Sequence, residues 1–236
     1  MAITKRAIDL LFSSVGLVLL AIFLPFLALA IYLDSPGPIF YRQRRAAALK
    51  AGGKAGHLQL TSFWMLKFRT MRVDAEARTG AVLAQQNDPR VTRLGAFLRR
   101  TRLDELPQFW NVFRGDMSLV GPRPERPELL QNLSLAIPFF EERMRDCKPG
   151  ITGLAQISLS YSGGAPDGSP VAALAGSLTN PYGFEAARGA LADDMRTKLL
   201  FDLAYVTGLA RFSTFIMTEL RIILFTPYIM LRGLGR

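Results

Sequence analysis

Hydrophobic positions are concentrated in one long stretch near the start of the chain. Leu10 to Leu33 contains 24 consecutive residues without a formal charge. As a continuous helix this stretch would be about 36 Å long, which is enough to cross a hydrocarbon core of roughly 30 Å. The pattern therefore predicts a membrane helix over this part of the chain.

Basic residues on both sides of this stretch predict how the helix is oriented. Lys5 and Arg6 precede it, and five more cations follow it by residue 54. Basic flanks favour the cytoplasmic side, and Pro25 favours a kink near Phe23 to Leu24. We therefore expect a re-entrant helix that enters and leaves the membrane by one face. A straight spanning helix and a cleaved secretory signal are the alternatives.

Beyond this helix the apolar runs are short and alternate with turn signals. The first of them predict a turn over Asp34 to Pro38, an extended stretch from Ile39 to Arg42, a loop from Ala46 to Gly56 and a strand from Phe63 to Met71. The next predict helices from Asp74 to Gln86 and from Thr92 to Arg99, a helix that begins at Pro107, and a buried strand from Met117 to Val120. Residues 158–189 are rich in Gly, Ser, Ala and Pro, which predicts a long loop. The last third, Lys198 to Arg236, suits interfacial amphipathic helices or ordinary core packing.

Together these elements predict a helix-rich, mixed α/β fold with a small sheet and several helices. We expect an N-terminal re-entrant membrane helix over residues 1–36. A cytoplasmic, membrane-associated domain follows over residues 37–236, with a loop-rich insertion at about 158–190.

Composition narrows the class of protein. The chain has 236 residues, a formal net charge of +10 and 50% hydrophobic residues. A chain that is both basic and apolar is more typical of an anionic membrane surface than of a nucleic-acid binder. Cys147 and His57 are the only cysteine and histidine, which excludes an internal disulfide and a Cys/His zinc site.

Two adjacent carboxylates, Asp104 and Glu105, stand in the most strongly cationic part of the chain. Their segment, Phe97 to Pro124, reads FLRRTRLDELPQFWNVFRGDMSLVGPRP. Its cations are Arg99, Arg100, Arg102, Arg114 and Arg123. Carboxylates among fixed positive charges ionise readily, can hold a divalent metal, and share their site with groups that attract phosphate. The residue pattern alone leaves open that the pair only balances surface arginines near a helix start.

Three further features suggest anion contacts. Lys67 and Arg69 are two residues apart on the predicted strand, so they would share a face. If the helix that begins at Thr92 continues past Arg99, Arg99 and Arg102 are i, i+3 neighbours that can converge on one anion, and Arg123 is fixed in direction by flanking prolines. An ordinary solvated face is the alternative for the strand.

The residues carry a family resemblance. The chain resembles a small monotopic phosphoglycosyl transferase, one of the bacterial sugar transferases that act on a polyprenyl carrier. The matching motifs are Lys5-Arg6-Ala7-Ile8-Asp9, Ser35-Pro36-Gly37-Pro38, Gln43-Arg44-Arg45, Lys67-Phe68-Arg69-Thr70-Met71, Asp88-Pro89-Arg90-Val91-Thr92, Leu103-Asp104-Glu105-Leu106-Pro107-Gln108, Gly115 to Pro124 and Lys148 to Gly153, with a weaker echo at Phe201 to Val206.

The resemblance implies an enzyme whose catalytic domain lies after the membrane helix. It would move a sugar 1-phosphate from a nucleotide diphosphate sugar, a UDP-sugar, to polyprenyl (undecaprenyl) phosphate and release UMP. By resemblance Asp104 is the nucleophile that forms a covalent phosphosugar intermediate. Mg²⁺ would bind at Asp104, with Glu105 as metal ligand or proton acceptor. Lys67, Arg69, Arg99 and Arg123 would contact phosphate or nucleotide.

The chain departs from the family pattern in places. Met144-Arg145 stands where the family often has Arg-His, so an anion contact would pass to Arg145 or Arg143. The segments 46–62 and 158–189 are longer than in compact relatives, and Leu154 replaces an aromatic residue. The identity of the sugar that the enzyme transfers therefore cannot be inferred from the resemblance.

The expected place of action is the cytoplasmic face of the bacterial inner membrane, at the first membrane step of exopolysaccharide or other glycoconjugate synthesis. Membrane lipids are expected partners and nucleic acid is not. The oligomeric state is open, with a dimer as one option. The alternative function is a non-catalytic, membrane-bound basic scaffold that recruits anionic partners.

Overall fold

The computed structural model describes residues 2–51, 58–73, 75, 88–145, 147–159 and 191–232. The predicted helix from Asp74 to Gln86 lies outside the described residues except for Ala75, and the predicted insertion at 158–190 lies outside them except for its first two residues.

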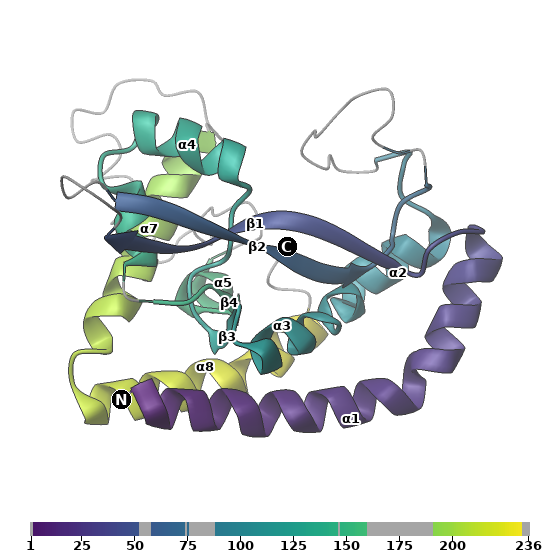
Figure 1. Ribbon diagram of the computed structural model, residues 1–236, viewed down its shortest axis with the longest axis horizontal. Coiled ribbons are helices and arrows are strands. Elements are labelled where there is room, and N and C mark those ends of the chain that lie inside the picture. Colours follow the sequence, from purple (N-terminus) through teal and green to yellow (C-terminus); the bar gives the residue numbers. More distant parts are fainter. Residues whose placement is uncertain are drawn as a thin grey trace.

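A long apolar helix, α1 (Ala2–Asp34), forms the base of the molecule and is bent in its second half (Figure 1). Pro25 lies in that half, where its ring excludes a backbone hydrogen bond, so the bend has the predicted cause. Many of the large side chains of α1 are exposed, among them Phe12, Phe23 and Phe26. Within the described residues, two helices could cross a membrane by length and composition: α1, and residues Phe212–Met230 of α8 (Phe212–Arg232).

A twisted ribbon of two antiparallel strands lies above this base: β1 (Phe40–Ala51) and β2 (Leu58–Phe68). Tyr41 is opposite Lys67 and Arg45 is opposite Phe63. The predicted loop over Ala46 to Gly56 is wrong as far as Ala51. The strands resume their pairing beyond an irregularity after Ala46, and the Thr61 hydroxyl bonds both backbone groups of Ala48 there.

The helices that follow begin and end where local chemistry dictates. Thr92 caps α2 (Arg93–Thr101) by accepting a hydrogen bond from Gly95 N at 3.0 Å, as predicted. After one 3₁₀ turn, η1 (Leu103–Glu105), the predicted helix at Pro107 is present as α3 (Gln108–Arg114). The chain then enters β3 (Ser118–Val120), the predicted buried strand.

A second small sheet joins β3 to β4 (Gly150–Thr152) in parallel. A Cβ on Gly150 would lie 2.2 Å from Gly121 N, so the glycine in the Lys148–Gly153 motif permits close packing of two backbones. The remaining elements are α4 (Pro127–Ala136), η2 (Phe140–Met144), α5 (Leu154–Ser158) and α7 (Leu191–Gly208). The fold is therefore helix-rich, mixed α/β, with small sheets and an N-terminal apolar helix, as predicted.

The start of α1 is fastened to the body of the domain. Asp9 Oδ1 accepts hydrogen bonds from Ser118 Oγ and Leu119 N, both at 2.9 Å. Lys5 Nζ lies 2.8 Å from Glu219 Oε1, and Arg6 donates to the carbonyl of Val112 at 2.7 Å. Lys5 and Arg6 therefore make tertiary contacts, in addition to providing the positive charge that precedes the apolar stretch.

Candidate active site

The acid pair lies on a tight connection between two helices. Arg102 ends α2 in the left-handed region, at φ 55°, and donates its backbone N–H to Arg99 O. The chain then makes the single turn of η1, which carries Asp104 and Glu105. Because both residues belong to one short turn between fixed helices, their carboxylates are held at one place.

Glu105 is bound by two cations. Its Oε1 accepts hydrogen bonds from Lys67 Nζ and from Arg123 Nη2, each at 2.8 Å. Burial raises the pKa of this carboxyl, but the charges and hydrogen bonds of Arg123 and Lys67 outweigh burial and hold the pKa well below its usual range. Glu105 is therefore a fixed negative charge in the centre of the site.

Asp104 is held much more loosely. Its closest cation is Lys67 Nζ, 4.0 Å from Oδ2, and it accepts no hydrogen bond from the described part of the chain. Burial raises its pKa to about 6, and the charge of Glu105 acts in the same direction, while Lys67, Arg99 and Arg123 oppose the rise. Two neighbouring carboxyls thus have pKa values shifted in opposite directions, a pattern typical of paired catalytic acids.

The cations at Glu105 come from two separate elements. Lys67 is the second-last residue of β2, and Arg123 follows β3 in the Gly121–Pro124 turn. Arg143 fixes this turn by donating to Arg123 O, and its other terminal nitrogen donates to Asp202 Oδ2 at 2.9 Å. Arg143 is 1% exposed, so it positions Arg123 from inside the protein.

The structure brings only some of the predicted contacts together. Lys67 and Arg123 bind the acid pair, and Arg99 is near enough to lower the pKa of Asp104 while its Nε donates to Thr70 Oγ1 at 2.8 Å. Arg69 instead donates to the carbonyls of Ser35 and Pro36, just after α1.

Arg145 is exposed and pairs with Glu142 on its own segment. For Arg69 and Arg145, a contact with substrate stays a prediction without support from their present partners.

Asp104 and Glu105 suit a metal that takes most of its ligands from the substrate. Among the described residues no group of three or more His, Cys, Asp or Glu side chains is placed to hold an ion. Mg²⁺ commonly binds one or two carboxylates together with waters and substrate phosphates. The Asp104 side chain is 11% exposed and lacks a hydrogen-bond donor among the described residues, so its oxygens suit such a role.

Sequence reasoning missed the positioning pair Arg143 and Asp202. Arg143 had been considered only as a contact for anions, and Asp202 only as part of the weaker motif at Phe201 to Val206. The two are 59 residues apart, and a pairing over that distance leaves no local pattern. The motif match at Asp202 was the one signal that could have found it.

Comparison with known proteins identifies the family of the chain. The family model described as bacterial sugar transferase matches residues 1–233. The chain is 48% identical over 143 residues to a putative undecaprenyl-phosphate N-acetylgalactosaminyl 1-phosphate transferase of Bacillus subtilis, covering 59% of this chain and 72% of the relative.

Longer relatives match over segments of similar length. Identity is 40% to a UDP-N-acetylgalactosamine-undecaprenyl-phosphate N-acetylgalactosaminephosphotransferase of Aeromonas hydrophila and 43% to a UDP-glucose:undecaprenyl-phosphate glucose-1-phosphate transferase of Xanthomonas campestris. The matches cover 70% and 60% of this chain, but only 36% and 27% of those relatives. On the match over nearly its whole length, and as its motifs predict, the chain belongs to the bacterial sugar transferase family of enzymes.

Proposed function

We propose that this protein transfers a sugar 1-phosphate from a UDP-sugar to undecaprenyl phosphate through a covalent intermediate on Asp104. The observation that carries the proposal is the contrast within the acid pair. Glu105 is bound by two cations, whereas Asp104 has one cation at 4.0 Å and no hydrogen-bond donor among the described residues. An ionised, loosely held carboxylate beside fixed positive charges is suited to attack a phosphorus atom.

The proposed reaction has two displacements at one phosphorus. An Asp104 oxygen attacks the phosphorus that carries the sugar, and the bond from this phosphorus to the bridging oxygen breaks, so UMP leaves with that oxygen. A phosphate oxygen of the acceptor then attacks the same phosphorus. The bond to Asp104 breaks, which restores the carboxylate and gives polyprenyl diphosphate sugar.

The cations act by holding charge in place during both steps. Lys67 and Arg123 face the acid pair and would offset the negative charge of the phosphates as they approach. Mg²⁺, held by Asp104 and Glu105, would neutralise the diphosphate when bound. The low pKa of Glu105 favours a role as metal ligand or fixed charge over one as proton acceptor.

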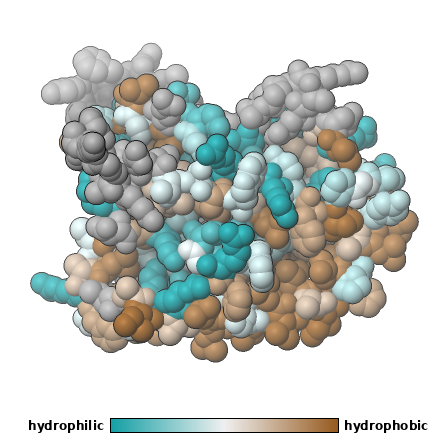
Figure 2. Space-filling model, viewed as in Figure 1, coloured by the Kyte–Doolittle hydropathy of each residue, from teal (hydrophilic) through white to brown (hydrophobic). Residues whose placement is uncertain are grey.

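The exposed apolar base suggests how the site meets its lipid acceptor. Figure 2 shows hydrophobic side chains gathered along the lower edge, where Figure 1 places α1 and α8. Exposed members include Phe23 and Phe26 on α1 and Leu224 on α8. We infer that this base lies in the cytoplasmic leaflet of the inner membrane, with the acid pair at the interface.

Contacts at both ends of α1 favour the re-entrant arrangement over a straight crossing. Asp9, near the start of the helix, binds β3, and the carbonyl of Ser35, just past its end, accepts from Arg69. One folded body therefore holds both ends, which a helix with its ends on opposite sides of a bilayer would not allow. The same contacts give Arg69 a structural role at the end of α1.

The decisive experiment detects the covalent intermediate. The full chain in vesicles with Mg²⁺ is incubated with a panel of UDP-sugars, without acceptor, and the protein is tested for bound, hydroxylamine-sensitive sugar phosphate and for UMP release. We expect label on the wild type with at least one donor, none on Asp104→Asn, and wild-type label on Glu128→Gln, which changes an exposed acid on α4. Equal label on Asp104→Asn would exclude Asp104 as the nucleophile, and absence of turnover with every donor would favour the scaffold function.

A further inference from the structure

The Gln43-Arg44-Arg45 motif lies on the ribbon, and the proposed mechanism leaves it without a role. Side chains alternate between the two faces of a strand, so Tyr41, Gln43 and Arg45 share one face of β1. Tyr41 is opposite Lys67, so this is also the face of the ribbon that presents Lys67 to the acid pair. A row of side chains therefore leads from Lys67 along β1 to Arg45, about 14 Å away along the strand.

Arg45 is partly buried at the far end of this row. It donates to Gln43 Oε1 at 2.6 Å and to the carbonyl of Pro124 at 3.1 Å, and its buried Nε has no partner among the described residues. The adjacent Ala46 N donates to Glu125 O at 2.9 Å, which joins β1 to the turn that carries Arg123. Arg45 is thus attached to the backbone segment that follows Arg123.

Positive charge is in excess around Arg45. Arg123 and Arg126 lower its pKa and Glu125 and Glu105 raise it, but burial is the largest influence, and the pKa falls to about 10. The cost of burying several guanidinium groups near one another is offset when an anion binds between them. Lys198 lies in similar surroundings, because its pKa is lowered by burial and by the charges of Arg123 and Arg143.

We propose that Arg45, together with Arg123, binds the phosphate of the donor that leaves as nucleoside monophosphate. This inference rests on the proposed function, because it assigns to Arg45 the half of the donor that Asp104 does not attack. Arg123 binds Glu105, and Arg45 donates to the carbonyl of the next residue, Pro124, so a diphosphate attacked at Asp104 would place its second phosphate toward Arg45. A planar guanidinium on the leaving phosphate would hold the negative charge that develops as UMP departs.

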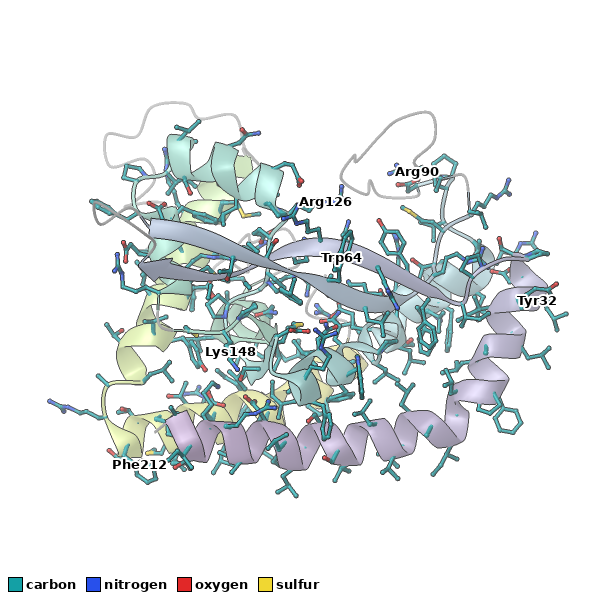
Figure 3. All side chains as sticks on the ribbon, in the orientation of Figure 1. Tyr32, Trp64, Arg90, Arg126, Lys148 and Phe212 are labelled. Carbon is teal, nitrogen blue, oxygen red and sulfur yellow. The ribbon has the colours of Figure 1, made fainter. Side chains whose placement is uncertain are left out.

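The position of this cluster favours the water-soluble donor over the lipid acceptor. Figure 3 shows Arg126, which influences Arg45, on the side of the ribbon away from α1 and α8. The acceptor phosphate, tied to a chain in the membrane, approaches from the apolar base. Arg126 is thus on the side open to a water-soluble donor, and we assign the phosphate at Arg45 to the nucleotide.

Binding of UMP to the full chain in vesicles tests this without turnover. Calorimetry is performed on the wild type, Arg45→Gln, Arg45→Lys and Arg44→Gln. We expect Arg45→Gln to weaken UMP binding at least about 10-fold, since it removes a charged hydrogen-bond donor, and Arg45→Lys to restore part of the affinity. Arg44 is the matched control, because it lies on the opposite, exposed face and donates to Ser62 Oγ. Arg44→Gln should bind UMP within about twofold of the wild type.

Two further ligands identify which phosphate Arg45 holds. Uridine, which lacks the phosphate, should bind the wild type and Arg45→Gln with the same affinity. Farnesyl phosphate should also bind both proteins with the same affinity. Undiminished UMP binding by Arg45→Gln would overturn the assignment, as would a loss confined to farnesyl phosphate or an equal loss in Arg44→Gln. These outcomes are separate from failure of the proposed function, which appears as absence of UMP release from every donor by the wild type.

Discussion

The acid pair at η1 and the ion pair between Arg143 and Asp202 both place a buried carboxylate next to cations, but the carboxylates differ in their hydrogen bonds. Burial raises the pKa of Asp202 to about 6, against the charge of Arg143, and the pKa of Asp104 is raised to about the same value. Asp202, however, accepts a hydrogen bond from Arg143 at 2.9 Å, whereas the nearest cation to Asp104 is 4.0 Å away.

This difference separates a group that holds the fold from one available for chemistry. Both carboxylates cost stability when ionised, because the pKa of each is raised, but the one with a direct guanidinium partner is held by it and is not free to form a new bond. The carboxylate that lacks such a partner is free to react. The comparison can be tested at each of its members.

The largest effect is expected from Asp104→Asn. An amide cannot attack phosphorus as a carboxylate does, so UMP release should fall by at least about a thousandfold, as is usual for loss of a nucleophile. Steady-state UMP release measures this, with flotation on vesicles to show that membrane association is unchanged. Residual turnover within tenfold of the wild type would place the nucleophile elsewhere.

Arg143→Met should mainly affect stability. It leaves Asp202 buried without its partner, which costs about 3 kcal/mol. Denaturant unfolding of the protein in detergent measures the loss. The double variant Arg143→Met with Asp202→Leu should lose less than Arg143→Met alone, because the unpaired charge of Asp202 is removed and only Glu125, 3.8 Å from Arg143, loses a cation. A larger loss in the double variant would show that the pair is not the main source of the effect.

Lys67→Gln should lower kcat/KM by about 100-fold and change its pH dependence. Asp104 must be ionised to attack, so activity should fall as the pH drops through about 6. Lys67 lowers the pKa of Asp104, so its removal should move this acid limb to higher pH. Arg44→Gln is the control for loss of a nearby positive charge. An acid limb that stays in place in Lys67→Gln would separate Lys67 from Asp104.

The smallest expected effect is on the stability of the folded protein, which the ionised Asp104 carboxylate lowers. The folded pKa of Asp104 lies above its unfolded value, so the folded state binds more protons and stability falls as the pH rises from about 4 to about 6. Asp104→Asn removes this loss and should stabilise the protein by at most about 3 kcal/mol at pH 8, with little effect near pH 4. Thermal unfolding at both pH values measures it. A destabilised Asp104→Asn at pH 8 would contradict the loosely held carboxylate.

Features with a local cause were predictable from the sequence. The apolar length of α1 and its proline, the cap at Thr92 and the strand at Val120 depend on neighbouring residues, and the structure contains all of them. The acid pair was also found from its own segment. The extension of β1 to Ala51 was not, because an alanine- and glycine-rich run reads as a loop until a partner strand is present.

Features that depend on distant contacts could not be predicted. Lys67 and Arg69 look equivalent on a strand, but β2 ends between them, and only Lys67 turns to the acid pair. The same holds for Arg145 and Arg143, two residues apart, of which one pairs on the surface and the other is buried beneath Arg123. Chain direction and strand termination decided these cases.

Because α1 is attached to the domain at both ends, the acid pair lies at a fixed distance from the apolar base. Asp9 holds β3, which leads directly to Arg123, and Arg69 holds the other end beside the strand that carries Lys67. The apolar base and the two cations of the acid pair therefore move as one unit. If the protein acts as proposed, the depth of the helix in the bilayer determines how far a lipid phosphate must rise to reach Asp104.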